Sequence, residues 1–181
     1  MIRIGYAPGA FDLFHIGHLN LLRRAKERCD FLIAGVVADE VLIEHKKVTP
    51  VIPLAERLEI VRNARSVDMA HAAMSNDKTK IWQELRFNVL FKGDDWQGTE
   101  KGIRLERDFA AFGVEVVYFP YTQATSSSAL RRTLQNIDVM ANRAFAAAPR
   151  RQLGGLIAER PEFGTVPTIG FESKERSVSR R

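Results

Sequence analysis

Two histidines, His15 and His18, lie three residues apart in the segment APGAFDLFHIGHLNLLRRAKER, where an apolar run gives way to a helical pattern. On the first turn of a helix this spacing points both imidazoles to the same side, where their ring N–H groups can donate hydrogen bonds to phosphate oxygens. Such donors stabilise the negative charge that grows during phosphoryl or nucleotidyl transfer. A single histidine would more often cap or pack against the helix, but a pair around Gly17 favours anion binding.

Five short apolar runs of strand length could position these histidines. The runs alternate with helical patterns, and this alternation predicts an α/β fold in which helices cover both faces of a parallel sheet. The runs cover residues 2–7, 31–37, 67–72, 89–92 and 114–119.

The first apolar run ends directly before the histidine segment, so this segment follows the carboxyl end of a strand. Ligands of open parallel sheets bind beyond such ends, where the strand order reverses. Gly9 supplies a tight turn there, and Gly17 lets the backbone approach a ligand closely. The helix that begins near Gly17 directs its unpaired N–H groups and the positive end of its dipole outward, which predicts an anion site at this edge.

Three helical patterns are prominent. The first has an apolar stripe that includes Cys29, which is expected to be a core residue; as the single cysteine it forms no intrachain disulfide and no cysteine-based zinc cluster. The second pattern begins after Thr99, the expected N-cap, and ends at Gly113. The third begins near Thr125.

The C-terminal part differs in composition from the rest. After about residue 148 the chain mixes Pro, Gly, Ser and charge without sustained periodicity, which is typical of a linker and a loosely ordered tail. Residues 150–181 hold seven Lys or Arg and four Glu, and so +3 of the net charge of +5. We expect a catalytic domain over residues 1–136 and a C-terminal helix with a basic tail over residues 137–181.

The remaining composition is ordinary for a soluble globular protein. No apolar run reaches the roughly 18 residues that a membrane-spanning helix needs, and the N-terminus lacks the plan of a signal peptide. A cytoplasmic protein without a membrane span is therefore expected. The positive net charge favours anionic partners, which include phosphorylated metabolites, nucleic acid and acidic lipid.

The histidine segment resembles the His-x-Gly-His signature of the nucleotidylyltransferase superfamily. Class I aminoacyl-tRNA synthetases share it, but they also need a Lys-Met-Ser-Lys-Ser type loop, which is absent here, and a tRNA-binding extension, for which 181 residues leave no room. The segment FKGDDWQG, residues 91–98, is similar to the Gly-Asp-Asp-Trp motif of the glycerol-3-phosphate cytidylyltransferase family. With GAFDLFHIGH, ADE, ERLEIVRNARSVD and TSSSALRR, the resemblance runs in order from about residue 2 to residue 135.

This resemblance implies a Rossmann-like, doubly wound sheet of five parallel strands in the order 3-2-1-4-5, followed by a C-terminal helical or irregular extension. It also implies a reaction in which CTP and an alcohol phosphate give a CDP-alcohol and pyrophosphate. Glycerol 3-phosphate or a related polyol phosphate is the expected acceptor, and magnesium is expected with the triphosphate. The family further implies a homodimer and no specific nucleic-acid partner.

The resemblance also implies roles for particular residues. His15 and His18 would contact the triphosphate, and Lys46 or Lys47 would be the catalytic lysine, the choice between them being open. Asp12 would lie beside the phosphates and the magnesium ion, although no metal ligand set is assigned to the protein. The other positions expected to bind the nucleotide or its phosphates are Gly9, Ala10, Phe11, Gly17, Gly93, Asp94, Trp96, Thr125, Ser126, Ser127 and Ser128.

Arg57 and Arg65 match family arginines on the helix after the lysine loop. We expect Arg57 to contact phosphate, since a guanidinium binds phosphate oxygens in a bidentate fork, and Arg65 to serve the acceptor site or a dimer interface. Either could instead be a surface arginine of an amphipathic helix. Asp39 is expected to be the N-cap of a helix that begins near Glu40. Trp96 could pack its loop instead of facing the nucleotide.

Three positions depart from the family pattern. Tyr121 stands where the fifth-strand motif has an arginine, Ala124 where it has a glycine, and Ala10 where serine or threonine is common. Arg131 or Arg132 could replace the missing guanidinium. Two alternatives stay open: an adenylyltransferase of the same superfamily, of heptose-phosphate or flavin-forming type, and a non-catalytic nucleotide-binding protein with a basic tail.

Overall fold

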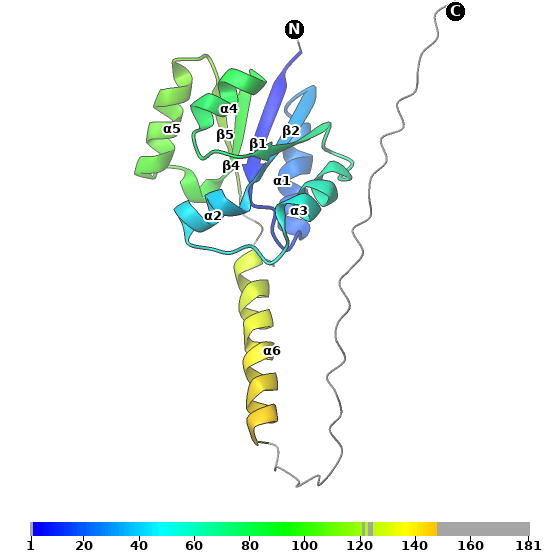
Figure 1. The fold of residues 1–181 in the computed structure, drawn as a ribbon. Coiled ribbons are helices and arrows are strands. Elements are labelled where there is room, and N and C mark those ends of the chain that lie inside the picture. The colour runs from blue at the N-terminus through cyan, green and yellow to red at the C-terminus, as the bar shows by residue number, and fades with distance from the viewer. Residues whose placement is uncertain (1, 121, 123–124, 148–181) are drawn as a thin grey trace, which may run out of the picture. The chain divides into compact units, whose positions relative to one another are not determined.

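The computed structural model describes residues 2–120, 122 and 125–147. The expectations for Tyr121, Ala124 and the basic tail fall outside these residues. Within them, five strands form one parallel sheet in the order β3-β2-β1-β4-β5, which confirms the expected Rossmann-like fold (Figure 1). The strands are β1 (Ile4–Gly9), β2 (Phe31–Val37), β3 (Met69–Ala73), β4 (Val89–Gly93) and β5 (Glu115–Phe119).

Helices connect the strands and lie against both faces of the sheet (Figure 1). Two of them, α1 and α3, pack on one face through residues such as Leu22 and Val61, while α4 and α5 pack on the other through residues such as Ile81 and Phe109. The helices are α1 (Ile16–Lys26), α2 (Asp39–Lys46), α3 (Leu54–Arg62), α4 (Lys78–Leu85), α5 (Glu100–Ala110) and α6 (Ser127–Ala147), with a 3-10 turn η1 (Asp94–Trp96).

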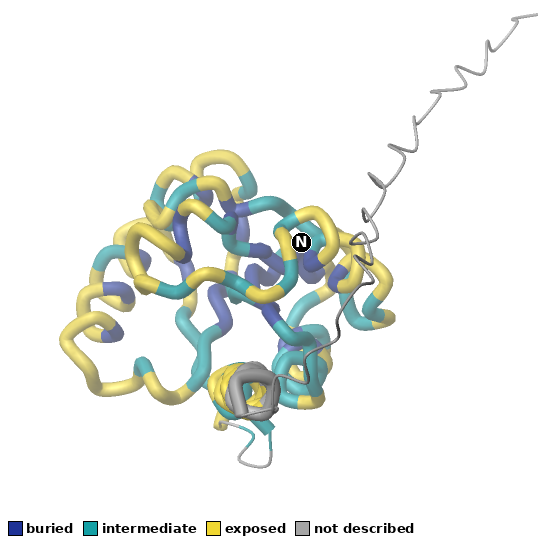
Figure 2. Tube along the Cα trace, turned by 60° about the horizontal axis from the view of Figure 1, so that its bottom comes forward, coloured by how far each residue is buried: buried dark blue, intermediate teal, exposed yellow. Residues whose placement is uncertain are grey.

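The core lies between the sheet and these helices. Figure 2 shows buried segments inside the body and exposed segments around it. Most of the buried apolar residues form two clusters, one on each face of the sheet. This two-sided burial explains why the strands appear in the sequence as nearly continuous apolar runs.

Strand β1 ends two residues later than its apolar pattern predicts. The pattern stops at Ala7, but Pro8 and Gly9 continue the ladder and pair with Gly35 and Val36 of β2. The turn that follows is therefore shorter than expected. It leads directly into α1 at the edge where the order reverses between β1 and β4, so the site is expected there.

The expected helix positions agree with the structure in part. Thr99 is the N-cap of α5, and its side chain accepts a hydrogen bond from the Gly102 N–H at 3.1 Å. Cys29 lies beyond the end of α1 and not on its apolar stripe as expected; it is half-buried against the apolar cluster, and its Sγ donates to the Ala25 carbonyl. Helix α6 passes without a break through position 136, so the domain boundary expected there stays a prediction.

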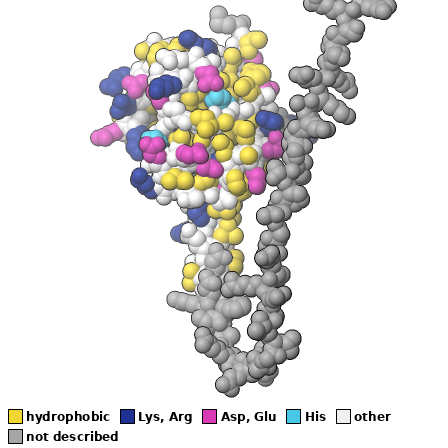
Figure 3. All heavy atoms as spheres, viewed as in Figure 1, with side chains coloured by type: hydrophobic (Ala, Val, Ile, Leu, Met, Phe, Trp, Pro, Cys, Tyr) yellow, Lys and Arg dark blue, Asp and Glu magenta, His cyan; other side chains and the backbone are white. Residues whose placement is uncertain are grey.

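The surface of the described body carries charge of both signs. Figure 3 shows acidic, basic and hydrophobic side chains side by side on one face, so that face offers no single-signed patch. Among the helices of the described residues, none is both long and apolar enough to cross a membrane.

Candidate functional site

The turn between β1 and α1 is held by its own apolar side chains. Phe11 and Leu13 both adopt left-handed backbone conformations, with φ of 52° and 50°, which non-glycine residues rarely do. The ring of Phe11 is buried and packs against the rings of Phe14 and His18. The side chain of Phe11 therefore belongs to the core.

The two histidines are fixed by backbone hydrogen bonds. His15 is the N-cap of α1, and its Nδ1 accepts from the Gly17 N–H at 3.0 Å; Nδ1 of His18 faces the His15 N–H at 3.4 Å. The ring centroids are 4.1 Å apart. Since Nδ1 of each ring is an acceptor, the proton of each neutral imidazole lies on Nε2 and is available to a ligand.

Burial keeps both imidazoles neutral. It lowers the pKa of His15, and with the neighbouring His15 it lowers the pKa of His18 to about 4, despite the opposing effect of Asp12. At neutral pH the pair thus offers two N–H donors without a positive charge on either ring. Gly17 matters here for a reason that its sequence context did not indicate: a Cβ at this position would lie 2.7 Å from Cε1 of His15.

Asp12 connects the histidine turn to two other segments. Its buried carboxylate accepts hydrogen bonds from the N–H groups of Val51 and Ile52 and from the Arg131 guanidinium at 2.6 Å. Burial alone would raise the pKa of Asp12, but these donors hold it below its usual value. The Ser127 hydroxyl donates to the Asp12 carbonyl at 2.8 Å, so the start of α6 is fastened to the turn.

A magnesium ion would find few free ligands in the described part of the chain. No group of three or more His, Cys, Asp or Glu side chains there could hold a metal ion. Both carboxylate oxygens of Asp12 already accept hydrogen bonds from protein donors. Magnesium bound to the triphosphate, with Asp12 beside it, stays a prediction.

Arg57 is buried and joins several segments of the protein through hydrogen bonds. Its side chain is 0% exposed, its Nε donates to the Ile52 carbonyl at 2.8 Å, and Nη1 donates to the Val37 carbonyl at 2.9 Å. The guanidinium also donates to the Ala10 carbonyl and pairs with the carboxylate of Asp39. The structure thus gives Arg57 a structural role in place of the phosphate contact that its motif predicted, because its donors are used inside the protein.

Asp39 and Arg65 also differ from expectation. Asp39 is the first residue of α2 and not its N-cap, a position that Ala38 takes; its carboxylate binds Arg57 and accepts from the Leu54 N–H at 3.2 Å. It links α2 to α3 because the chain turns back between them. Arg65 is exposed and follows the end of α3, so it does not lie on that helix.

A cavity beside the two histidines, here called the histidine pocket, opens between the ends of β4 and β5 and the start of α1. It brings the histidines together with Gly93 and Trp96 of the motif FKGDDWQG, while Asp94 lies beside it in η1. Its lining residues are His15, Gly17, His18, Leu21, Lys46, Lys92, Gly93, Asp95, Trp96, Phe119, Pro120 and Thr122.

His18 also borders a second cavity, here called the serine cleft, at the start of α6. It joins basic groups and hydroxyls around the backbone of the histidine turn. Its lining residues are Ala10, Asp12, His18, Leu42, Lys46, Val48, Pro50, Ser127, Ser128 and Arg131.

The serines of the last motif have different tasks. Ser126 accepts a hydrogen bond from the Ala129 N–H at 3.2 Å and so caps α6. The Ser127 hydroxyl donates to the Asp12 carbonyl, and Ser128 is exposed at the serine cleft. Thr125 precedes the helix and is half-buried. Arg131 lines the cleft, and its buried Nε has no hydrogen-bond partner among the described residues. Replacement of the missing family guanidinium by Arg131 or Arg132 stays a prediction.

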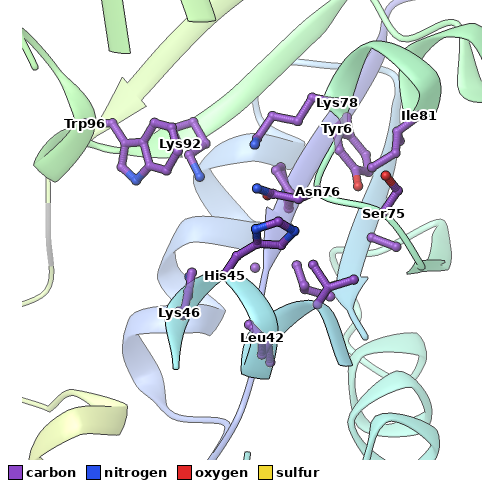
Figure 4. A pocket seen from close by; sticks show the side chains of 15 residues that line it. Tyr6, Leu42, His45, Lys46, Ser75, Asn76, Lys78, Ile81, Lys92 and Trp96 are labelled. Carbon is purple, nitrogen blue, oxygen red and sulfur yellow. The ribbon is translucent and has the colours of Figure 1, made fainter. Parts of the chain in front are cut away.

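A third cavity, here called the lysine cavity, lies at the ends of β1, β2 and β4 (Figure 4). Nζ of Lys92 lies 3.9 Å from the ring centroid of Trp96, and Nζ of Lys78 lies 5.4 Å from it. Burial and the neighbouring Lys78 and Lys46 lower the pKa of Lys92 to about 7, and burial with Lys46 also lowers the pKa of Lys78. The lining residues are Tyr6, Pro8, Gly9, Val37, Val41, Leu42, His45, Lys46, Ala73, Ser75, Asn76, Lys78, Ile81, Lys92 and Trp96.

The structure separates the two adjacent lysines. Lys46 ends α2 and lines the histidine pocket, the serine cleft and the lysine cavity. Lys47 is the C-cap of α2 in a left-handed conformation, with φ of 54°, and lines none of these three cavities. The geometry therefore favours Lys46 as the lysine that reaches the phosphates.

Sequence reasoning missed three residues of the lysine cavity: Tyr6, Lys78 and Lys92. Lys92 lies inside FKGDDWQG, directly before the glycine, and Lys78 follows the end of β3, so their places at strand ends could have indicated them. Tyr6 carries no such signal, because a tyrosine within an apolar strand usually belongs to the core.

Residues 6–133 match the family model described as cytidylyltransferase-like. The chain belongs to this family. The glycerol-3-phosphate cytidylyltransferase of Staphylococcus aureus is 31% identical over 132 residues, which cover 72% of this chain and 93% of that enzyme. The ethanolamine-phosphate cytidylyltransferase of Arabidopsis thaliana is 37% identical over 95 residues, and this cytidylyltransferase-like chain covers only 22% of its length.

Solved structures show the same fold. The crystal structure of the lipopolysaccharide core biosynthesis protein from Thermoplasma volcanium superposes with a TM-score of 0.58 and 22% sequence identity. The match covers 69% of this chain and 100% of that one. At this identity the likeness concerns the cytidylyltransferase-like fold alone.

Proposed function

We propose that this chain transfers the cytidylyl group of CTP to glycerol 3-phosphate or a related polyol phosphate and releases pyrophosphate. The observation that carries the proposal is a shared wall: Lys46, Lys92 and Trp96 line both the histidine pocket and the lysine cavity. Two phosphorylated ligands in these adjoining cavities would meet at that wall, as direct transfer between them requires.

The triphosphate would occupy the histidine pocket and the serine cleft, which share His18 and Lys46. An oxygen of the acceptor phosphate attacks the α-phosphorus, and the bond from that phosphorus to the pyrophosphate oxygen breaks. The Nε2–H groups of His15 and His18 would donate to the oxygens on which charge grows, while the ammonium of Lys46 attracts the departing pyrophosphate. The attacking phosphate oxygen is already ionised, so no general base is needed.

The acceptor phosphate would lie between Lys78 and Lys92, next to Trp96. Burial, Lys78 and Lys46 lower the pKa of Lys92, and a phosphate dianion beside the two ammonium groups would stabilise their charged forms. Magnesium, as part of this proposal, would neutralise part of the triphosphate charge. The protein residues themselves bind and orient, which is the main requirement for a transfer that involves no covalent enzyme intermediate.

The nucleotide and the acceptor can be tested together. Purified protein with magnesium, each of the four nucleoside triphosphates and a panel of alcohol phosphates would be assayed for pyrophosphate release. Turnover with CTP and a polyol phosphate is expected. Turnover with ATP and none with CTP would indicate an adenylyltransferase. A preference for ethanolamine phosphate would show that this compound, and not a polyol phosphate, is the acceptor. Nucleotide binding without turnover for any pair would indicate a non-catalytic binding protein.

The proposal includes a homodimer, which the family resemblance supports. Arg65 is exposed and therefore available for a subunit contact. Sedimentation velocity of the wild type and of Arg65→Glu would test this. A dimer that the substitution weakens is expected, and a monomeric wild type would contradict it.

A further inference from the structure

One group in the lysine cavity has no task in the proposed transfer: the hydroxyl of Tyr6. This side chain is 0% exposed, and its hydroxyl has no hydrogen-bond partner among the described residues. A buried hydroxyl without a partner costs free energy, so it is rare in folded proteins unless a ligand or a water completes it.

The surrounding strands hold the Tyr6 ring in one orientation. The ring stacks on Phe87, with centroids 4.9 Å apart, and belongs to the apolar cluster that includes Ile81 and Ala73. Its hydroxyl passes over Gly35 of β2, where a Cβ would lie 2.1 Å from the hydroxyl oxygen. The glycine at position 35 therefore makes room for this hydroxyl at the floor of the cavity.

The cavity has two chemically different ends. The ammonium groups of Lys78 and Lys92 lie near Trp96, on the side of the cavity that is shared with the histidine pocket. Figure 4 shows the Tyr6 hydroxyl on the other side, where Ser75 also lies. A ligand that spans the cavity would thus place an anionic group at the lysines and an uncharged hydrogen-bonding group at Tyr6.

We propose that the Tyr6 hydroxyl is a specificity contact for the acceptor, hydrogen-bonded to a hydroxyl on its alcohol part while the acceptor phosphate lies between Lys78 and Lys92. This inference rests on the proposed function and adds the residue that recognises the alcohol part of the acceptor. The phenol can either donate to that hydroxyl or accept from it. This hydrogen bond would give the Tyr6 hydroxyl the partner that it lacks among the described residues.

The same cavity disfavours an acceptor with a cationic tail. None of its fifteen lining residues carries a carboxylate that could pair with an ammonium group. The Trp96 ring, which could attract a cation, already faces the ammonium groups of Lys92 and Lys78. An ethanolamine phosphate would therefore bring a fourth ammonium group into a cavity that Lys46, Lys78 and Lys92 already line, and a polyol phosphate would not.

The substitution Tyr6→Phe isolates this contact, because it removes only the hydroxyl and keeps the stacked ring. The wild type and the variant would be assayed with CTP and four acceptors: glycerol 3-phosphate, 3-hydroxypropyl phosphate, propyl phosphate and ethanolamine phosphate. Tyr118→Phe is the matched control, since the Tyr118 hydroxyl donates to Glu106 at 2.7 Å and lines no part of the lysine cavity.

In Tyr6→Phe we expect kcat/KM for a hydroxyl-bearing acceptor to fall by about tenfold, the usual effect of one lost hydrogen bond. Values for propyl phosphate and the KM for CTP should stay within about twofold of the wild type. Tyr118→Phe should change neither. The free energy of unfolding of Tyr6→Phe should not fall, because the hydroxyl makes no hydrogen bond with any residue that the structure describes. A purely structural role would instead lower this free energy and affect all acceptors alike.

If the wild type uses glycerol 3-phosphate and Tyr6→Phe treats all four acceptors as the wild type does, the inference is wrong and the proposed function stands. If the wild type shows no transferase activity, the proposed function fails, and calorimetric titration with glycerol 3-phosphate still decides the contact. Binding that weakens about tenfold in Tyr6→Phe but not in Tyr118→Phe would support it. Equal binding by the three proteins, or none, would overturn it.

Discussion

The histidine pocket and the lysine cavity share a wall, but they are built in opposite ways. The histidine pair comes from one short segment, and each ring is fixed by a backbone N–H within three positions in the chain. The lysine cavity takes Tyr6 from β1, Lys46 from α2, Lys78 from α4 and Lys92 from β4. Local sequence positions the histidine pair, and only the completed sheet positions the groups of the lysine cavity.

This difference separates what is general in the site from what is particular to the chain. The two histidines proposed to bind the triphosphate lie on a short motif whose geometry is set by helix capping and by Gly17. The groups proposed to select the acceptor lie on separate elements, where a substitution on one strand leaves the motif intact. Acceptor preference could therefore change while nucleotide chemistry is kept, as expected where function resides in sites placed on a common fold.

The largest effect is expected in the histidine pocket. His18→Ala removes an N–H donor aimed at the growing charge, so kcat should fall on the order of a hundredfold or more. The measurement is steady-state release of pyrophosphate, with circular dichroism to show that the fold is kept. His71→Ala, on β3 and outside the three cavities, should leave kcat unchanged. Normal turnover by His18→Ala would remove this histidine from the chemistry.

Arg57 joins the two regions, because it binds the carbonyl of Ala10 in the histidine turn and the carboxylate of Asp39 at the start of α2. Arg57→Ala should lower the free energy of unfolding by about 3 kcal/mol, since it leaves several buried acceptors without a donor. Arg65→Ala, at an exposed position, should change it by less than about 0.5 kcal/mol. Urea denaturation measures both. A fully stable Arg57→Ala with weakened acceptor binding would restore the phosphate contact first expected for Arg57.

The adjacent lysines test the shared wall. Lys46→Ala should lower kcat/KM by about ten- to a hundredfold, because Lys46 lines both cavities and the serine cleft. Lys47→Ala is the matched control and should stay within about twofold of the wild type, since Lys47 caps α2 and lines none of them. Kinetic constants for CTP and for the acceptor would be measured separately. Equal losses in the two variants would contradict the separation of the two lysines.

The acceptor side should also respond to pH. The pKa of Lys92 is about 7 in the free protein, so its ammonium is increasingly lost above that pH. The affinity of the free protein for glycerol 3-phosphate, measured by calorimetric titration without CTP, should therefore fall above pH 7 by up to about tenfold per pH unit. Lys92→Arg keeps its charge throughout this range and should remove the fall. A pH profile identical in the wild type and in Lys92→Arg would mean that Lys92 does not bind the acceptor in its charged form.

The smallest effect is expected from the tail. A chain that ends after residue 148 keeps every residue that lines the three cavities, so its kcat/KM should remain within about twofold of the full chain. The same assay of pyrophosphate release checks this. Loss of activity in a folded, shortened protein would show that the tail contributes to the site.

The sequence predicts the fold well because burial on both faces of the sheet leaves a direct trace, namely apolar runs separated by helical patterns. It predicts the histidine turn for the same reason, since a short motif contains its own hydrogen-bond partners. Long-range partners leave no such trace: Arg57 and Asp39 are 18 residues apart, and nothing in either segment indicates that they pair. Their roles as a phosphate ligand and an N-cap were therefore predicted incorrectly.

The lysine cavity shows the same limit. Lys92 lies in a motif that was identified, yet its place under Trp96 depends on the fold of η1. Tyr6 resembles any strand tyrosine until its hydroxyl is found without a partner over Gly35. A residue of this kind is identified by what it lacks in the folded protein, and composition and periodicity contain no information on that.

The bond between Asp12 and Arg131 has a consequence for how the molecule forms. The two residues are 119 positions apart, and the Ser127 hydroxyl reaches back 115 positions to the same turn. During synthesis the first strand and its turn emerge early, but the cation that balances the buried carboxylate is made only after the whole sheet has been translated. Contacts of such long range form late and slow the search for the native state. The turn that begins the domain is thus completed by its last helix, and a fragment that stops at β5 would leave Asp12 without this ion pair.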